Sequence, residues 1–216
     1  MQELKEWLEI ANYLSTVTLA VVAILALRQI SLAKQQIETT KELFKKQSKR
    51  ASIEATINEC KRFADHVIQD HIKIIEHCQK NNITFFSDVK FQRDGDSITV
   101  DATNAKKEDA PKLKEMGSLL TSFCNGLEAH AMYFLSGIAD ENIAYHTNAQ
   151  SYLDLCEDAY KIFASAGKKS KDIDAIQTLY FRWATRMEKD ELAEQQIEIN
   201  KKLSTFNQTP IRPIGR

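Results

Sequence analysis

The feature that most constrains this chain of 216 residues is an uncharged run near its N-terminus. From Ile10 to Leu27 no residue carries a charge in the sequence IANYLSTVTLAVVAILAL. As a helix that rises ~1.5 Å per residue, this run spans about 27 Å, close to the ~30 Å hydrocarbon core of a bilayer. Its length and composition predict a single transmembrane helix, with residues 1–30 as the anchor.

Two alternatives compete with a transmembrane anchor. A cleaved signal peptide requires a basic segment before the apolar run, whereas three Glu and one Lys precede it here, and no small-residue cleavage site follows. A buried helix of a soluble domain stays open, because the run contains an Asn, a Ser and two Thr residues. The anchor remains the prediction.

The charges that flank the run predict its orientation. Residues 28–50 hold seven basic and two acidic residues, while the N-terminal flank is acidic. Because Lys and Arg are enriched on the cytoplasmic side of membrane spans, the bulk of the chain is expected in the cytoplasm and the N-terminus outside.

Small and polar residues gather on one side of the predicted span when each position is advanced by ~100°. A single helix surrounded by lipid does not require such segregation. Helix association favours it, because small residues allow close backbone approach and polar residues form hydrogen bonds with the neighbouring helix. The pattern predicts that the helix meets copies of itself, the alternative being a chance small-residue face on a monomeric anchor. The predicted interface consists of Asn12, Ser15, Thr16, Thr18, Ala20, Ala23 and Ala26, with Leu19, Val22 and Leu27 intruding on it.

Composition limits the remaining possibilities. With 29 Lys and Arg against 30 Asp and Glu, the net charge of −1 provides no bulk attraction to nucleic acid, and no direct nucleic-acid binding is expected. Only 6 Gly and 3 Pro make an all-β fold implausible, so the expected fold class is all-α. The four cysteines form no Cys-x-x-Cys pair, and neither a metal nor a cofactor is predicted.

The predicted organisation follows from where helix breakers occur. No Gly or Pro precedes Gly95, so the anchor is expected to run into a long cytoplasmic helix over residues 31–80. A helical bundle is expected over residues 81–204, with an insertion at 83–109 that is either a loop or a small hairpin around Asp94-Gly95-Asp96. Residues 205–216, which contain two of the three prolines, are expected to be a disordered tail.

Three polar residues in the long helix are candidates for chemistry. Asn58, Arg62 and His66 are spaced by four and would share one helix face, where a cation and an imidazole suit phosphate chemistry. The helical ribonucleases of the HEPN class use Arg, four to six residues, then His, whereas only three residues separate Arg62 from His66. A solvated or intersubunit polar stripe is therefore the preferred interpretation, with catalysis as the alternative.

A second polar group lies in the segment FCNGLEAHAMYF. Because this segment is otherwise apolar enough for a core, Asn125 and Glu128 are expected to form a structural polar clasp, with a ligand or ion site as the alternative. Gly126 would let a neighbouring helix come close. His130 and His146 are interpreted as core or boundary histidines.

The order of these features resembles a known family. The anchor WLEIANYLSTVTLAVVAILAL, the segment LLTSFCNGLEAHAMYFLSGIADENI and a last helix with Trp183 resemble small bacterial single-pass proteins with a helical cytoplasmic domain. Among these the chain is most similar to the membrane accessory proteins of type VI-B CRISPR–Cas systems, which are encoded beside an RNA-guided ribonuclease. The resemblance implies a divergent HEPN-like fold and an inner-membrane homo-oligomeric pore that depolarises the membrane in antiviral defence.

A pore would use the two halves of the span differently. One helix cannot enclose water, so conduction requires a ring of copies. The polar residues lie in the outer half of the span, whereas Leu19 to Leu27 has no polar side chain and would form a dewetting constriction. Leu19, Val22 and Leu27 are the predicted gate. A membrane-anchored scaffold or signalling module without a pore is the first alternative function, and a HEPN-like ribonuclease is the second.

Overall fold

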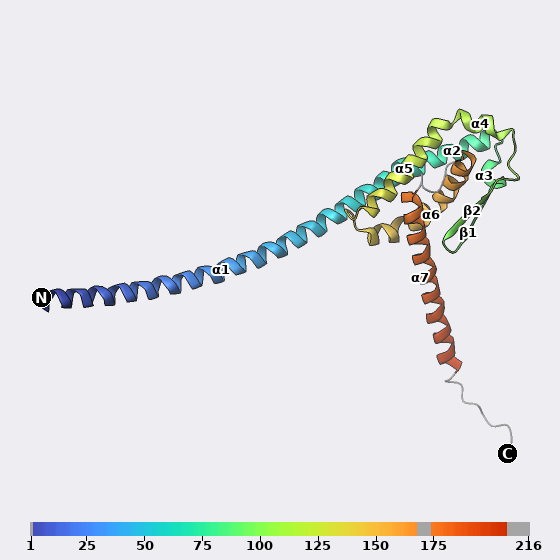
Figure 1. Cartoon of the computed structure of the whole chain (residues 1–216). Helices are drawn as coiled ribbons and strands as arrows, with labels where there is room; N and C mark the ends of the chain where they lie inside the picture. The colour runs from blue at the N-terminus through green and yellow to red at the C-terminus, as the bar shows by residue number, and fades with distance from the viewer. Residues whose placement is uncertain (1, 168–173, 207–216) are drawn as a thin grey trace, which may run out of the picture. The chain divides into compact units, whose positions relative to one another are not determined.

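One helix opens the chain in the computed structural model, which describes residues 2–167 and 174–206 (Figure 1). Helix α1 (Gln2–Arg62) runs for 61 residues without a Gly or Pro, then passes through the π-helix η1 (Phe63–Ile68) into α2 (Gln69–Lys80). The helix ends where Asn82 adopts a φ of 49° and the Ile83 amide bonds the Cys78 carbonyl at 2.9 Å. The prediction of a long helix to residue 80 is confirmed.

Two compact units divide the chain between Ala51 and Ser52. The first unit is the N-terminal part of α1, and each of its described side chains is exposed. The second unit begins at Ser52, so residues 52–80, the last part of the predicted long cytoplasmic helix, belong to this unit rather than to a separate segment. Phe63 and Ile74, which are fully buried there, explain this difference from the predicted boundary near residue 80.

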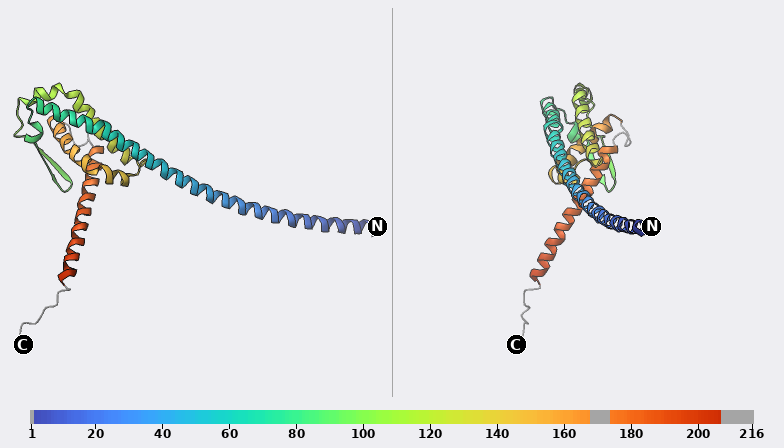
Figure 2. Two further views of the ribbon diagram at one scale, coloured as in Figure 1. Left: turned by 180° about the vertical axis from the view of Figure 1, so that it is seen from behind. Right: turned by 90° about the vertical axis from the view of Figure 1, so that its left-hand side faces the viewer.

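Helix α5 (Gly117–Leu135) is the centre of the second unit. It packs against η1, α2, α4, α6 and α7, and both views of Figure 2 show α5 and α7 close together. Helices α4 (Asp109–Glu115) and α5 are separated at Met116, and α6 covers Glu141–Ser165. The largest fully buried side chains of the core are Trp183, Tyr152, Phe63, Phe123 and Phe134.

The turn between α5 and α6 follows its sequence signals. Gly137 has a φ of 73°, which a residue with a side chain rarely adopts, and it terminates α5. The Asp140 carboxylate then accepts hydrogen bonds from the amides of Asn142 (3.1 Å) and Ile143 (3.3 Å) and caps the start of α6. Gly137 and Asp140 therefore set where α5 ends and where α6 begins.

Helix α7 (Asp174–Phe206) is buried only in its first part. Trp183 and Ala184 lie in the core, whereas every residue from 188 to 204 is exposed. The helix includes residues 205 and 206, which were expected in the disordered tail, because neither Gly nor Pro interrupts it. The rest of the predicted tail, residues 207–216, lies outside the described residues.

The insertion at residues 83–109 contains a short helix and a hairpin. Helix α3 (Phe85–Asp88) precedes strands β1 (Lys90–Asp94) and β2 (Ser97–Asp101), which pair antiparallel from Lys90 with Asp101 to Asp94 with Ser97. Gly95, with a φ of 57°, takes the first position of the two-residue turn. The open choice between loop and hairpin is thereby decided, and the fold is mostly helical rather than purely all-α.

The π-helix meets α5 at a glycine. A Cβ atom added to Gly126 would lie 2.8 Å from Cγ2 of Val67, a residue of η1 that is 2% exposed. The backbone of α5 can approach η1 this closely only because position 126 has no side chain. The expectation that Gly126 admits a neighbouring helix is confirmed.

Candidate functional site

The predicted span lies wholly within α1 and is unburied. Its large apolar side chains between Ile10 and Leu27 are 51% to 75% exposed. Within the described part of the chain, this helix alone is long and apolar enough to cross a membrane, and none of its apolar window is buried. The N-terminal helix is therefore compatible with a single membrane span, and the alternative of a buried soluble helix is not what this chain forms by itself.

Helical geometry through the span brings the predicted interface residues onto one side. All of them are exposed in the single chain, so each is accessible to lipid or to another copy. Small side chains on this side leave the backbone open to close approach by a second helix. The residues concerned are Asn12, Ser15, Thr16, Thr18, Ala20, Ala23 and Ala26, with the larger Leu19, Val22 and Leu27 among them.

The hydroxyl groups of this side bond to their own helix. The Asn12 carbonyl accepts from Ser15 Oγ at 2.9 Å and from Thr16 Oγ1 at 2.8 Å, and Thr18 Oγ1 donates to the Leu14 carbonyl at 2.7 Å. Their protons therefore do not require a partner from another helix, unlike the expectation from sequence. Asn12 differs from these hydroxyl residues, because none of these hydrogen bonds involves its side-chain carboxamide.

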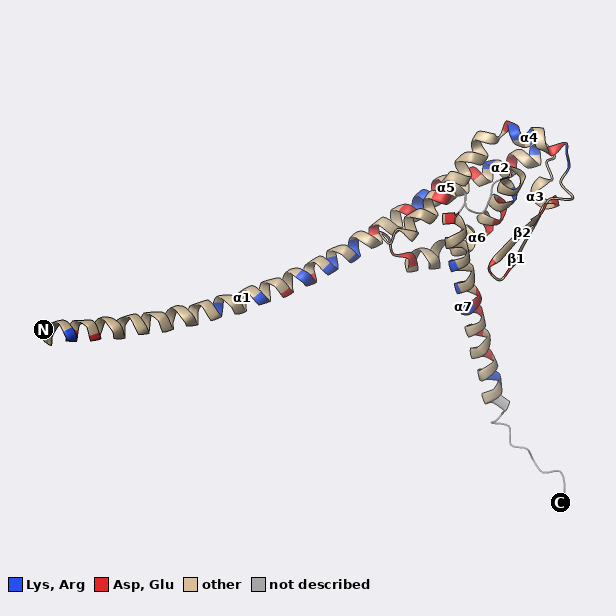
Figure 3. Ribbon diagram, viewed as in Figure 1, with Lys and Arg blue, Asp and Glu red and all other residues tan. Residues whose placement is uncertain are grey.

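A basic segment follows the span. The side chains of residues 28–50 are all exposed, and they include the seven basic and two acidic residues of the flank. Figure 3 shows these charges spaced along α1 beyond its uncharged stretch. Exposed cations next to an apolar helix are suited to anionic lipid headgroups.

The three spaced polar residues of the long helix do not form a joint site. Asn58 and His66 are exposed, and the Arg62 side chain turns to a carboxylate instead. Arg62 Nη2 lies 2.6 Å from Glu59 Oε1, and Arg62 Nε lies 2.8 Å from Glu59 Oε2. Because this fork occupies the guanidinium, the surface-stripe interpretation describes these residues better than a phosphate site.

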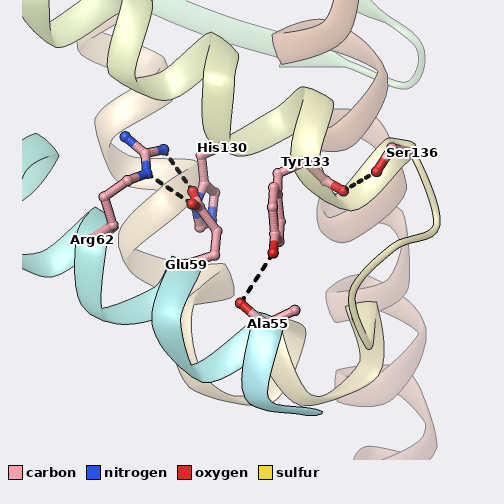
Figure 4. Close-up of polar contacts among 6 residues, drawn as sticks. All are labelled: Ala55, Glu59, Arg62, His130, Tyr133 and Ser136. Atoms are coloured by element: carbon pink, nitrogen blue, oxygen red, sulfur yellow. Dashed lines mark hydrogen bonds and ion pairs between the residues drawn. The ribbon is translucent and has the colours of Figure 1, made fainter. Parts of the chain in front are cut away.

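Glu59 connects Arg62 to a buried histidine of α5. Its Oε1 atom lies 2.9 Å from Nδ1 of His130, which is fully buried (Figure 4). The rings of Phe63 and Phe134 lie 4.2 Å and 4.9 Å from the imidazole centroid. The first turns of the bundle are thus joined to α5 by one polar cluster within an aromatic core.

Electrostatics fix the state of this cluster. Burial raises the pKa of Glu59, but hydrogen bonds from His130 and Arg62 outweigh burial, and the pKa lies below its ordinary value. Burial lowers the pKa of His130 despite the hydrogen bond to Glu59. An ionised carboxylate only accepts, so the neutral His130 ring carries its proton on Nδ1, and Nε2 is a buried acceptor without a partner. The arrangement is a structural connection, without a substrate-accessible base.

The predicted polar clasp on α5 is not in the core. Asn125 is exposed and Glu128 is partly exposed, so the expectation of a buried Asn125 is wrong. The polar residue buried in this segment is His130, which is in phase with Phe123, Leu127 and Phe134 at spacings of three and four. That spacing was the available signal, whereas nothing in the sequence pointed to Glu59 as the partner. His146 is exposed, near Arg186.

Comparisons of this chain with known protein families, characterised proteins and solved structures found no match.

Proposed function

We propose that this protein is a single-pass membrane protein whose span assembles with copies of itself into a pore-like ring. The observation that carries the proposal is the unburied uncharged stretch of α1, in which small and polar residues occupy one side. Exposed apolar residues require lipid, and a small-residue side supports helix association within it. The basic segment after the span supports an orientation with the second unit in the cytoplasm of a bacterial cell and the N-terminus outside the inner membrane.

In such a ring the outer and inner halves of the span would differ. Asn12, Ser15, Thr16 and Thr18 would give the outer half a surface that wets readily. Leu19, Val22 and Leu27 would narrow and dry the inner half, so the pore would be closed by default. The resemblance to type VI-B accessory proteins supplies the physiological part of the proposal, in which opening depolarises the membrane and strengthens antiviral defence by a partner RNA-guided ribonuclease.

A depolarisation assay in cells tests pore formation. We expect Asn12→Leu to weaken dye-reported depolarisation by removing the one carboxamide on the small-residue side of the helix, and Leu19→Asn to increase it by wetting the constriction. Matched controls on the opposite side of the helix are Tyr13→Leu and Val21→Asn, which should change depolarisation less. Equal effects on both sides would contradict the pore.

Assembly is tested separately from conduction. Full-length protein in mild detergent should cross-link into a ladder that ends at a closed number of copies. A chain that stays monomeric removes the basis of the pore. Reading the genes that adjoin this one tests the link to an RNA-guided ribonuclease, and the absence of a CRISPR locus would contradict that part alone.

A membrane-anchored scaffold or signalling module without a pore is the second candidate. It is favoured by the hydroxyl groups of Ser15, Thr16 and Thr18, whose protons are already bonded within their own helix. Assembly without depolarisation would decide for the scaffold. The geometry does not support the ribonuclease alternative, because the Arg62 guanidinium is paired with the Glu59 carboxylate. Loss of function in the double variant Arg62→Ala with His66→Ala, with assembly intact, would support it.

A further inference from the structure

A pocket of about 600 Å³ opens between α3, α4, α5 and α6 of the second unit. Its wall is mainly apolar and includes Phe85, Leu113, Leu120 and Ile162, from four different helices. Concave sites of this volume with apolar walls and few polar groups are typical of small-molecule binding. The pocket is far in the sequence from the membrane span and plays no part in the proposed pore.

Among the described residues, lysines are the only charged ones that line this pocket. Lys106, Lys107 and Lys114 are exposed around it, and no carboxylate of residues 2–167 or 174–206 lines it. Lys106 Nζ lies 3.9 Å from Asp88 Oδ2, which is a long ion pair. Lys107 and Lys114 take part in none of the ion pairs of the described residues. The pocket therefore combines an apolar wall with two lysines, Lys107 and Lys114, that no described carboxylate pairs with.

The hydroxyl protons of the other polar side chains in the described wall are bonded to backbone carbonyls of their own helices. Thr121 Oγ1 donates to the Gly117 carbonyl at 2.8 Å, and Ser165 Oγ donates to the Ile162 carbonyl at 2.7 Å. No Asn or Gln is among the described residues of the wall, which therefore offers few of the paired donors and acceptors that recognise a base or a sugar. Such a wall favours a ligand that is apolar along its length and anionic at one end.

We propose that this pocket binds a single-chain anionic amphiphile of the fatty-carboxylate class. The chain would lie against Leu113, Leu120 and Ile162, and the carboxylate would lie at Lys107 and Lys114. A carboxylate paired with an ammonium forms a charge-assisted hydrogen bond, which is about twice as strong as a neutral one. This site goes beyond the proposed pore and does not depend on it.

Gly117 offers a way to close the pocket without disturbing the fold. It lines the pocket, and a Cβ atom added to it would meet nothing within 4 Å. Its φ is not positive, so a larger residue is not strained there. Gly117→Leu should therefore fill space that a ligand would otherwise occupy.

Photolabelling of the full-length protein in nanodiscs tests the proposal. A dodecanoate with a diazirine at its chain end should label peptides that contain Leu113, Leu120 or Ile162, and excess dodecanoate should compete. We expect labelling to fall roughly tenfold or more in Lys107→Gln with Lys114→Gln, and likewise in Gly117→Leu. Lys189→Gln, which changes an exposed lysine of α7, should leave it unchanged.

The span supplies an internal reference, because probe dissolved in lipid should label residues 10–27 equally in all variants. Four results would each overturn the site. The first two are unlabelled pocket peptides in the wild type and unchanged labelling in the variants. The other two are equal labelling by an uncharged dodecanol probe, and protection by a peptide of residues 188–204, which has a negative net charge, but not by dodecanoate. All four are independent of whether the protein forms a pore.

Discussion

The two units of this chain differ in how far they expose the same kinds of apolar side chain. Val21 and Ile24 of the first unit are 51% and 66% exposed, whereas Val67 and Ile74 of the second are 2% and 0% exposed. Burying one such side chain contributes about 1.5–3 kcal/mol. The second unit therefore obtains this stabilisation within its own fold, while the first can obtain it only from something outside this unit, for which lipid and other copies are the proposed candidates.

Their threonines make a finer comparison. Thr16 in the first unit and Thr56 in the second both donate to the carbonyl four residues earlier, at 2.8 Å. Thr56 is fully buried and also accepts a hydrogen bond from the Asp140 amide at 2.7 Å. A bond within the helix thus leaves the oxygen free to accept, and Thr16 keeps this capacity for a donor outside its own chain.

The largest expected effect comes from charging the side of the proposed span that would face lipid. Val21→Arg with Ile24→Arg should cost about 6 kcal/mol of membrane insertion and move the protein from the carbonate-resistant membrane fraction to the soluble or aggregated fraction. The control, Ile37→Arg with Phe44→Arg, adds the same charge to exposed positions beyond the span and should leave the protein in the membrane. Retention of the first variant would mean that this unit does not depend on lipid.

Within the second unit, the largest effect should come from its buried polar cluster. Glu59→Ala leaves the neutral His130 N–H buried without an acceptor and should lower the free energy of unfolding by about 3 kcal/mol. Because Arg62 is 37% exposed, its own loss of a partner should matter less. Thermal unfolding of the full-length protein, followed by near-ultraviolet circular dichroism, measures this. Asn58→Ala, at an exposed position of the same turn, is the control, and equal midpoints would contradict the role of the cluster.

A smaller effect is expected where η1 meets α5. Gly126→Ala places a Cβ atom 2.8 Å from Val67 and should lower the free energy of unfolding by about 2 kcal/mol through overpacking. Gly117→Ala, whose Cβ atom meets nothing, should be neutral or slightly stabilising. Adding Val67→Ala to Gly126→Ala should restore part of the loss. If Val67→Ala restores no stability, the close approach of Gly126 to Val67 is not the cause of the loss in Gly126→Ala.

These results separate what the sequence predicts from what it does not. The long helix, the Asp140 cap and the glycine at position 126 follow from local rules about helix breakers, caps and missing side chains. Glu59 and His130 lie 71 residues apart, and no local pattern joins them. The apolar residues around Asn125 favour a place in the core for it. The spacing of Phe123, Leu127 and Phe134, however, puts Asn125 on the side of α5 that faces away from the core. Pairing between distant elements is a tertiary property that one sequence does not display.

The smallest expected effect is a dependence of stability on pH that only the second unit should show. Burial lowers the pKa of His130 below its ordinary value of about 6.5, so between these two pKa values the unfolded chain binds more protons than the folded one. Stability is then fully present above about pH 6.5 and is lost as the pH falls below it. The lowered pKa of Glu59 adds a second loss at more acidic pH.

Unfolding midpoints of the full-length protein between pH 7.5 and pH 5 measure this slope. In His130→Gln the amide still donates to Glu59 but does not titrate, so the decline between pH 6.5 and pH 5 should flatten. His66→Gln, at an exposed position of η1, should keep the slope of the wild type. A midpoint that rises on acidification, or an equal slope in His130→Gln, would show that the buried imidazole does not remain neutral in the folded protein.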